Sequence, residues 1–264
     1  MKASTNRLHR VKRVIQELIV LRKNFYNWDV IIKRAINGKR IQILNLRNGL
    51  NLYNANNNTL SIYKEIFVNK VYSKGVVKID EGDIVFDIGA NVGVFSLFAA
   101  KVKGTQIFSF EPHPKNYAVL MNNVTKNELN NIRCFKFALG LQNEDRVLIE
   151  GNIAGGHKLS HNSNATISEG TLEVKSVTLE SMLEKLDIDT IDFIKLDCEG
   201  AEGEIIKSLG NDGLLKINKM AIEFHDNHSI LSHDEILTAL KNAGFKTSLK
   251  WDGTSYFGYI YANR

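Results

Sequence analysis

The chain has few of the features that mark secreted or membrane-spanning proteins. Only two cysteines, Cys134 and Cys198, occur among its 264 residues, which excludes a disulfide framework and favours buried free thiols in a reducing compartment. No apolar run approaches the roughly eighteen residues that a membrane span needs, and no signal-peptide pattern opens the sequence. We therefore expect a cytoplasmic protein. The sequence leaves open whether it also makes a peripheral membrane contact.

Internal repeats and low-complexity tracts are also absent. The hydrophobic content of 44% and the charged content of 24% are ordinary for a soluble globular protein. The length allows one α/β domain with an extension, or two small domains. The oligomeric state is left open by the sequence.

The positive charge is concentrated near the amino terminus. Residues 1–50 contain twelve Lys and Arg against two carboxylates, a net charge of +10, which leaves −5 for residues 51–264. Apolar residues recur there at helical spacing, at Leu8, Val11, Ile15, Leu18 and Ile19, with Arg7, Arg10 and Arg13 off that stripe. This pattern indicates an amphipathic helix that either contacts an acidic surface, such as anionic lipid or nucleic acid, or packs on the main domain as an accessory element.

Strands and helices alternate from Lys78 onward. Strands are predicted at residues 84–88, 105–110, 132–138, 146–150, 171–177, 191–197, 219–224, 245–250 and 256–261. Helices are predicted at residues 92–103, 114–126, 178–186, 201–209 and 231–243. Repeated strand-helix units with apolar strands predict a doubly wound α/β domain with a mostly parallel sheet and helices on both faces. The closing pair is expected to be a hairpin, so the last strand is predicted to be antiparallel.

Residues 1–77 are less regular and are predicted to form a basic helix followed by a hairpin. Residues 41–46 and 50–53 flank Arg47-Asn-Gly49, and an Asn-Gly pair between strands is typical of a hairpin turn. We therefore divide the chain into an amino-terminal extension, 1–77, and a main domain, 78–264.

Three sequence elements predict a nucleoside-bearing cofactor. The first strand ends in Asp87-Ile-Gly-Ala-Asn-Val-Gly93, where Gly89 allows a tight turn and Gly93 allows close helix packing. The dinucleotide fingerprint G-x-G-x-x-G is not present, because Asn91 stands between these glycines. Glu111 follows the second strand, where a carboxylate binds ribose hydroxyls, and Ala138 begins a plausible backbone wall for a purine.

These motifs also resemble a known family. The runs VFDIGANVGVFSLFAAK, FSFEPHPKNYAVLMNNV, FALG and FIKLDCEGAE, over roughly residues 45–225, resemble the FkbM-type family of S-adenosylmethionine-dependent methyltransferases. The stretch from Tyr63 to Tyr72 resembles the lead-in to that family's first strand. Cys198 departs from the pattern, since a small aliphatic residue is more usual there, and we expect only a change in packing.

The resemblance implies a Rossmann-like class I methyltransferase fold, whose seven-stranded sheet has an antiparallel last strand, with S-adenosyl-L-methionine as cofactor. It also implies roles for individual residues. Gly89, Asn91 and Gly93 would line the methionine and ribose part, Glu111 would bind the ribose and Ala138 would lie beside adenine. Asp87 would hold the cofactor amino group, directly or through water.

Methyl transfer to a hydroxyl needs alignment and a nearby base. Asp197, which is also expected to contact the cofactor, Glu199 and His225 are the predicted catalytic residues, since they follow the later strands. Other candidates are Glu223 and the loop histidines His157 and His161. Glu202 and Glu204 fall in the first turn of a predicted helix, where carboxylates favour the helix dipole, and are interpreted as structural.

A divalent metal is a further hypothesis for this region. Asp197, Glu199, Glu223 and His225 would offer oxygen and imidazole ligands to Mg²⁺ or Mn²⁺. Such an ion could acidify a substrate hydroxyl. Nothing in the spacing of these residues demands an ion, so no metal ligand is predicted.

The leading functional hypothesis, drawn mainly from the resemblance, is O-methylation of a sugar, glycan or related polyhydroxylated metabolite. The loop at residues 151–170, rich in Gly, Asn, Ser and His, could face such an acceptor. One alternative is an RNA methyltransferase, although the sequence contains no RNA-binding module or aromatic-rich basic stripe. Another is a non-catalytic cofactor-binding protein that docks a membrane-associated partner.

Overall fold

The computed structural model describes residues 2–55, 57–151, 156–160 and 168–264. Within it the chain forms two compact units, residues 1–61 and residues 62–264. Residues 62–77 belong to the second unit and contribute to the site described below. Among the described residues, no helix combines the length and the apolar character needed to cross a bilayer.

The first unit contains two helices and a hairpin. Helices α1 (Lys2–Asn24) and α2 (Trp28–Ile36) precede strands β1 (Ile43–Asn45) and β2 (Asn51–Tyr53), which pair antiparallel. The turn between the strands contains Gly49 at a φ of 91°, a left-handed conformation that glycine adopts without strain. The predicted hairpin is therefore confirmed. Phe25, Leu44 and Leu52 are buried between these elements.

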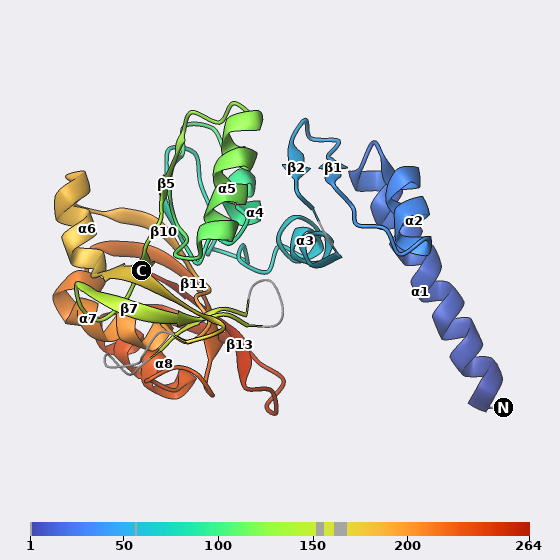
Figure 1. The fold of residues 1–264 in the computed structure, drawn as a ribbon. Coiled ribbons are helices and arrows are strands. Elements are labelled where there is room, and N and C mark those ends of the chain that lie inside the picture. The colour runs from blue at the N-terminus through green and yellow to red at the C-terminus, as the bar shows by residue number, and fades with distance from the viewer. Residues whose placement is uncertain (1, 56, 152–155, 161–167) are drawn as a thin grey trace. The chain divides into compact units, whose positions relative to one another are not determined.

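A seven-stranded sheet forms the centre of the second unit (Figure 1). Its strands are β3 (Ile84–Ile88), β4 (Gln106–Phe110), β5 (Ile132–Phe135), β10 (Ile191–Leu196), β11 (Ile217–His225), β12 (Lys246–Lys250) and β13 (Phe257–Asn263). Their order is β12-β13-β11-β10-β3-β4-β5, and β13 alone runs opposite to the other six strands. The predicted doubly wound sheet with an antiparallel last strand is confirmed.

Helices cover both faces of this sheet (Figure 1). Helices α4 (Val94–Ala99) and α5 (Pro114–Lys126) lie on one face, and α6 (Leu179–Leu186), α7 (Glu202–Leu214) and α8 (His233–Asn242) on the other. Local sequence sets their starts: the Thr178 side chain accepts the Ser181 N–H, and Ser232 forms a capping box with Glu235. Before the sheet, α3 (Asn57–Tyr63) continues into a π-helix, η1 (Lys64–Val68).

The alternating pattern of residues 132–138 predicts a single strand, and this prediction is wrong. Strand β5 ends at Phe135, whose carbonyl accepts the Glu111 N–H at 3.1 Å. The chain then turns, and β6 (Ala138–Leu139) pairs instead with β9 (Thr171–Val177). Together with β7 (Glu144–Ile149) and β8 (Lys158–Leu159), these strands form a second, four-stranded sheet. The apolar alternation thus spans two sheets, and its residues Phe135, Phe137 and Leu139 belong to one core cluster.

Candidate functional site

A cavity of about 390 Å³ lies at the carboxyl ends of β3, β4 and β10, entirely within the second unit. Ligands of open α/β sheets bind at such an edge, because the loops that follow parallel strands meet there. Ala138 of the small sheet and Glu65 of η1 also line it. Five carboxylate side chains reach the cavity, and among its described lining residues there is no Lys or Arg.

The loop after β3 approaches the loop after β10 so closely that only glycine fits. Gly89 has a φ of 77°, and a Cβ atom there would lie 1.8 Å from the carbonyl oxygen of Asp197. Gly93 has a different role, because its Cβ would meet the Leu120 side chain at 2.5 Å and because it does not line the cavity. Gly89 and Asn91 therefore face the cavity, while Gly93 lets α4 pack against α5.

Glu111 is held in place by backbone donors. The N–H of Asn91 donates to its Oε2 at 2.8 Å and the N–H of His113 donates to its Oε1 at 2.9 Å. The Asn116 side chain is a further hydrogen-bond partner of this carboxylate. A carboxylate has about four lone-pair sites, so acceptor capacity remains for ribose hydroxyls. Burial raises the pKa of Glu111 to about 7, against the lowering effect of these backbone hydrogen bonds.

An apolar wall lies next to Glu111. Phe110, Ala138, Leu139 and Leu148 line this part of the cavity, and all four are buried. A flat purine ring is favoured by such a surface, and a ribose by the free lone pairs of Glu111. The residues present thus fit the nucleoside part of S-adenosylmethionine. We call this region, made by Gly89, Asn91, Glu111, Ala138 and Leu139, the nucleoside end.

Asp87 does not line the cavity but lies behind its wall. It is fully buried and accepts hydrogen bonds from the Ser96 hydroxyl, with the oxygens 2.5 Å apart, and from Lys195 Nζ at 3.1 Å. Lys195 also donates to the carbonyl oxygen of Gly89 at 2.9 Å. Asp87 therefore acts on the cavity through Lys195, which fixes the Gly89 turn, and any contact with the cofactor amino group stays a prediction.

The other acidic lining residues of the cavity are Glu65, Asp197, Glu199 and Glu223, which we call the carboxylate end. The Tyr72 hydroxyl lies 2.9 Å from Asp197 Oδ2 and 2.5 Å from Glu223 Oε2. Lys195 Nζ lies 3.5 Å from the same Asp197 oxygen. Although burial lowers the pKa of Lys195, the charges of Asp87 and Asp197 outweigh it and raise that pKa, so the ammonium group stays charged.

Two of these carboxyl groups titrate near neutral pH. Burial and the charge of Asp197 raise the pKa of Glu223 to about 8, against the hydrogen bond from Tyr72. Burial also raises the pKa of Glu199 to about 7, against the opposing effect of His225. Because a hydroxyl has one proton, Tyr72 can donate to only one carboxylate at a time. When Glu223 is protonated, its carboxyl O–H donates a hydrogen bond to the Tyr72 oxygen, and the Tyr72 hydroxyl donates to Asp197.

His225 is the last residue of β11, two positions after Glu223, but it does not line the cavity. Its Nδ1 lies 3.1 Å from the buried Glu202, and its Nε2 lies 3.7 Å from Glu199. Burial lowers the pKa of His225, but the hydrogen bond and charge of Glu202 raise it to about 10. The imidazole is therefore already protonated at neutral pH and cannot accept a further proton.

Glu202 and Glu204 lie in the first turn of α7, as predicted, but both are buried and have specific partners. Glu202 accepts the backbone N–H groups of Cys198 and Gly200 at 2.9 Å, in addition to its contact with His225. Glu204 binds Arg146 of β7 through both guanidinium nitrogens, at 3.0 and 3.1 Å. One residue shapes the loop after β10, and the other attaches the small sheet to α7.

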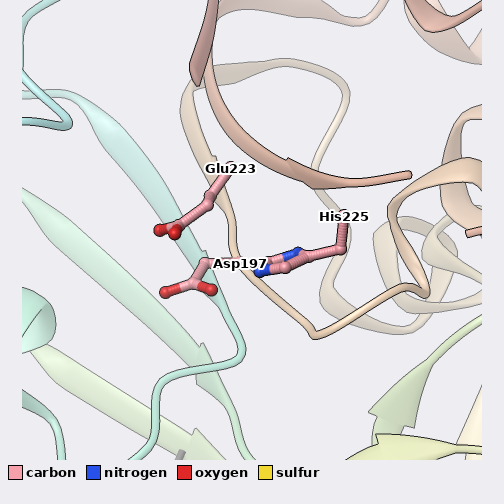
Figure 2. Close-up of side chains that lie close together, drawn as sticks. All are labelled: Asp197, Glu223 and His225. Atoms are coloured by element: carbon pink, nitrogen blue, oxygen red, sulfur yellow. The ribbon is translucent and has the colours of Figure 1, made fainter. Parts of the chain in front are cut away.

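Asp197, Glu223 and His225 lie close together (Figure 2), and their ligand atoms are all within 4.8 Å of one another. These three residues could therefore hold a metal ion. The Tyr72 hydroxyl already bridges the two carboxylates, and Lys195 neutralises Asp197. A metal ion at this place would have to displace the Tyr72 hydroxyl and would lie close to the positive charge of Lys195. The prediction that no metal is bound stays a prediction.

Of the two loop histidines, the structure describes only His157. His157 lines the cavity and stacks on His113 with ring centroids 4.1 Å apart, while His161 lies outside the described residues. His113 Nε2 contacts Glu150 at 3.0 Å. Cys134 and Cys198 are free thiols, half-buried rather than buried, and Cys198 packs against two apolar clusters, in keeping with the expected packing change.

No role for Lys195, Tyr72 or Glu65 was predicted from the sequence. Lys195 could have been found from its pattern, because it is the one charged residue within the apolar run FIKL and stands two residues before Asp197, on the same side of the strand. Tyr72 and Glu65 precede the sheet, and their sequence context gives no comparable signal. Their position depends on tertiary packing.

Comparisons with known proteins agree with this geometry. The Methyltransferase FkbM domain matches residues 87–247, which is more than half of the chain. The 31-O-demethyl-FK506 methyltransferase FkbM of Streptomyces tacrolimicus is 23% identical over 252 residues, covering 80% of this chain and 92% of that protein. The hexuronic acid methyltransferase AglP of Haloferax volcanii is 25% identical over 148 residues, covering 55% of this chain and 57% of that protein.

A solved structure is also similar. Methyltransferase FkbM from Methylobacillus flagellatus KT has a TM-score of 0.47 and 18% identity, over 72% of this chain and 45% of that one. The matched residues 87–247 include all the segments that build the nucleoside end. The chain therefore belongs to the FkbM methyltransferase family and is an S-adenosylmethionine-dependent methyltransferase.

Proposed function

We propose that the enzyme methylates a hydroxyl group of an uncharged polyhydroxylated acceptor, a sugar or glycan. The observation that carries this proposal is the carboxylate end. Four carboxylate side chains line the cavity there, and no Lys or Arg lines it among the residues that the structure describes. Carboxylate oxygens accept hydrogen bonds from hydroxyls, whereas a phosphate or carboxylate on the acceptor would find no cationic partner.

The chemistry asks little of the protein beyond alignment and proton removal. Bound S-adenosylmethionine supplies a methyl group that is already activated by its sulfonium. As the acceptor oxygen bonds to the methyl carbon and the carbon–sulfur bond breaks, the hydroxyl proton must leave. We assign that proton to Glu223, with Glu199 as the second candidate, since both line the cavity and have a pKa raised toward the working pH.

The remaining residues would position these groups. Tyr72 and Lys195 would orient Asp197 and Glu223, and Asp197 would keep the predicted contact with the cofactor. His225, predicted to be catalytic, becomes a positioning residue that acts through Glu199 and Glu202. At the nucleoside end, Glu111 would bind the ribose hydroxyls and Ala138 would lie beside adenine, with Gly89 and Asn91 along the methionine and ribose part.

The names of the relatives support an oxygen nucleophile and, in one case, a sugar. One relative is named for a 31-O-demethyl compound and another for hexuronic acid. The cavity of the present enzyme differs from what a hexuronate would favour, because no basic side chain lines it among the described residues. We therefore propose neutral sugars rather than uronic acids as its acceptors.

A methyl-transfer screen with labelled S-adenosylmethionine tests the proposal. The panel should pair each neutral sugar or oligosaccharide with its uronic acid counterpart and should include total RNA. We expect label in a neutral hydroxylated acceptor and alkali-stable linkage of the methyl group, as an ether requires. Label confined to RNA, or to carboxylate groups as alkali-labile esters, would contradict the proposal. The Glu223→Gln variant is the matched control for transfer that depends on the site.

A further inference from the structure

Helix α1 carries an exposed apolar face. Its carboxyl-terminal end is anchored in the first unit, where Leu21 and the following Phe25 are buried. The amino-terminal part of the helix extends beyond α2 (Figure 1). On this helix Val14, Ile15, Leu18 and Ile19 are exposed to 53%, 50%, 38% and 59%. Large aliphatic side chains with this exposure, on consecutive turns of a helix, indicate a surface that binds a protein or a membrane.

The four residues share one side of the helix. Their spacing of one, three and four residues confines them to an arc of about 140° at 3.6 residues per turn. Two exposed lysines, Lys12 and Lys23, lie along one border of this arc, next to Ile19 in helical projection. The whole of α1 contains seven Lys and Arg against one carboxylate, Glu17, a net charge of +6. Apolar and basic surfaces therefore lie side by side on one element.

We propose that α1 is an interfacial helix that docks the enzyme on an anionic lipid membrane. Its apolar arc would enter the boundary between headgroups and acyl chains, and the bordering lysines would contact the acidic headgroups. A lipid surface accommodates both features at once. This inference is independent of the identity of the methyl acceptor.

Other occupants fit the helix less well. A second copy of α1 would cover the apolar arc, but it would bring two segments of net charge +6 together. Nucleic acid would match the charge, yet it would leave Val14, Ile15, Leu18 and Ile19 in water. The second unit could cover the arc within the same chain. In that case the four side chains would stabilise the fold rather than bind vesicles.

Co-sedimentation of the full chain with large unilamellar vesicles tests the proposal. One set contains phosphatidylcholine alone, and the other an equal mixture of phosphatidylcholine and phosphatidylglycerol. We expect the partition coefficient to be at least about tenfold higher on the anionic vesicles and to fall as salt is raised. Equal partition onto both vesicle types, or none onto the anionic set, overturns the proposal.

Two variants separate the apolar and the charged contributions. Ile15→Ser with Ile19→Ser should lower the partition coefficient on anionic vesicles about tenfold, because two aliphatic side chains no longer enter the membrane. Lys12→Glu with Lys23→Glu should lower it by a similar factor and flatten its salt dependence. The matched control, Val76→Ser with Leu215→Ser, removes exposed apolar residues of the second unit and should change nothing.

Three further readouts on the same proteins identify the competing occupants. S-adenosylhomocysteine affinity should stay the same in all variants, which shows that the second unit remains folded. A lower thermal midpoint in Ile15→Ser with Ile19→Ser, without vesicle binding by the parent chain, would indicate cover within the chain. Dissociation of a dimer by this variant in sedimentation equilibrium would indicate a second copy. Either result overturns membrane docking.

Discussion

The nucleoside end and the carboxylate end of the cavity are built in different ways. At the nucleoside end a single carboxylate, Glu111, is held by two backbone N–H groups. At the carboxylate end, four carboxylates come from η1, β11 and the loop after β10, and side chains such as Tyr72 and Lys195 hold them. Backbone donors tie the first end to the fold itself. Because the carboxylate end depends on side-chain partners, substitutions there can change its charge and the acceptor that it binds.

The strongest way to test this difference is to remove the proposed base. Glu223→Gln should lower kcat by roughly 10²–10³, because an amide cannot accept the hydroxyl proton. S-adenosylhomocysteine affinity, measured by calorimetry, should stay within about threefold, since the nucleoside end is intact. Glu199→Gln is the matched control, with a smaller expected loss. A larger loss for Glu199→Gln than for Glu223→Gln would move the proton to Glu199.

The converse substitution should affect binding. Glu111→Ala should weaken S-adenosylmethionine binding about 100-fold, because two hydrogen bonds to a buried carboxylate are lost. Glu111→Gln keeps one acceptor oxygen and should lose less. Calorimetric titration measures both variants, with Glu65→Gln, at the carboxylate end, as the control that should bind normally. Unchanged binding by Glu111→Ala would exclude the proposed ribose contact.

The two ends should also differ in their pH dependence. Glu223 must be ionised to accept a proton, so kcat should rise about tenfold per pH unit below its pKa and level off above about 8. Glu111 accepts ribose hydroxyls best when ionised, so cofactor affinity should fall as pH drops below about 7 and be constant above it. Rate and affinity curves with the same midpoint would contradict the assignment of separate groups.

Tyr72 connects Asp197 to Glu223 and gives a smaller expected effect. Tyr72→Phe should lower kcat about tenfold, because the base loses the hydroxyl that orients it. The hydrogen bond from Tyr72 lowers the pKa of Glu223, so its removal should move the acid limb of the pH–rate profile upward. A kcat loss without that movement would indicate a purely structural role for Tyr72.

Metal removal should have the smallest effect. With Tyr72 between Asp197 and Glu223, and Lys195 beside Asp197, we expect EDTA treatment to change kcat by less than about twofold. Metal analysis of the purified enzyme accompanies the assay. Inactivation by EDTA that Mg²⁺ or Mn²⁺ reverses would instead indicate an ion held by Asp197, Glu223 and His225.

The nucleoside end could be predicted because its residues follow strands directly in the sequence. Gly89, Asn91, Glu111 and Ala138 all lie within a few residues of an apolar run, and the topology of a parallel sheet brings such positions together. Even there the sequence does not separate Gly93 and Asp87, which support the wall, from the residues that line it. Lining depends on packing distances that spacing does not encode.

The carboxylate end was only half predictable. Asp197 and Glu199 follow β10 directly, but Tyr72 reaches Glu223 across 151 residues of sequence. His225 was predicted to be catalytic from its place after a strand, and its protonation depends on the buried Glu202 in another element. The charge state of a buried group is set by neighbours that are distant in sequence, which local patterns cannot show.

The ion pair between Arg146 and Glu204 has a consequence for engineering and for divergence within the family. The small sheet of β6, β7, β8 and β9 is inserted between β5 and α6, and this pair attaches it to the turn of α7 that also carries Glu202. In a chimaera whose residues 138–177 come from a relative, the small sheet is therefore expected to stay attached to α7 only when the incoming segment brings a cation for Glu204. The apolar wall beside Ala138 and Leu139 at the nucleoside end can then change with the small sheet, while the side chains of the carboxylate end keep their own support.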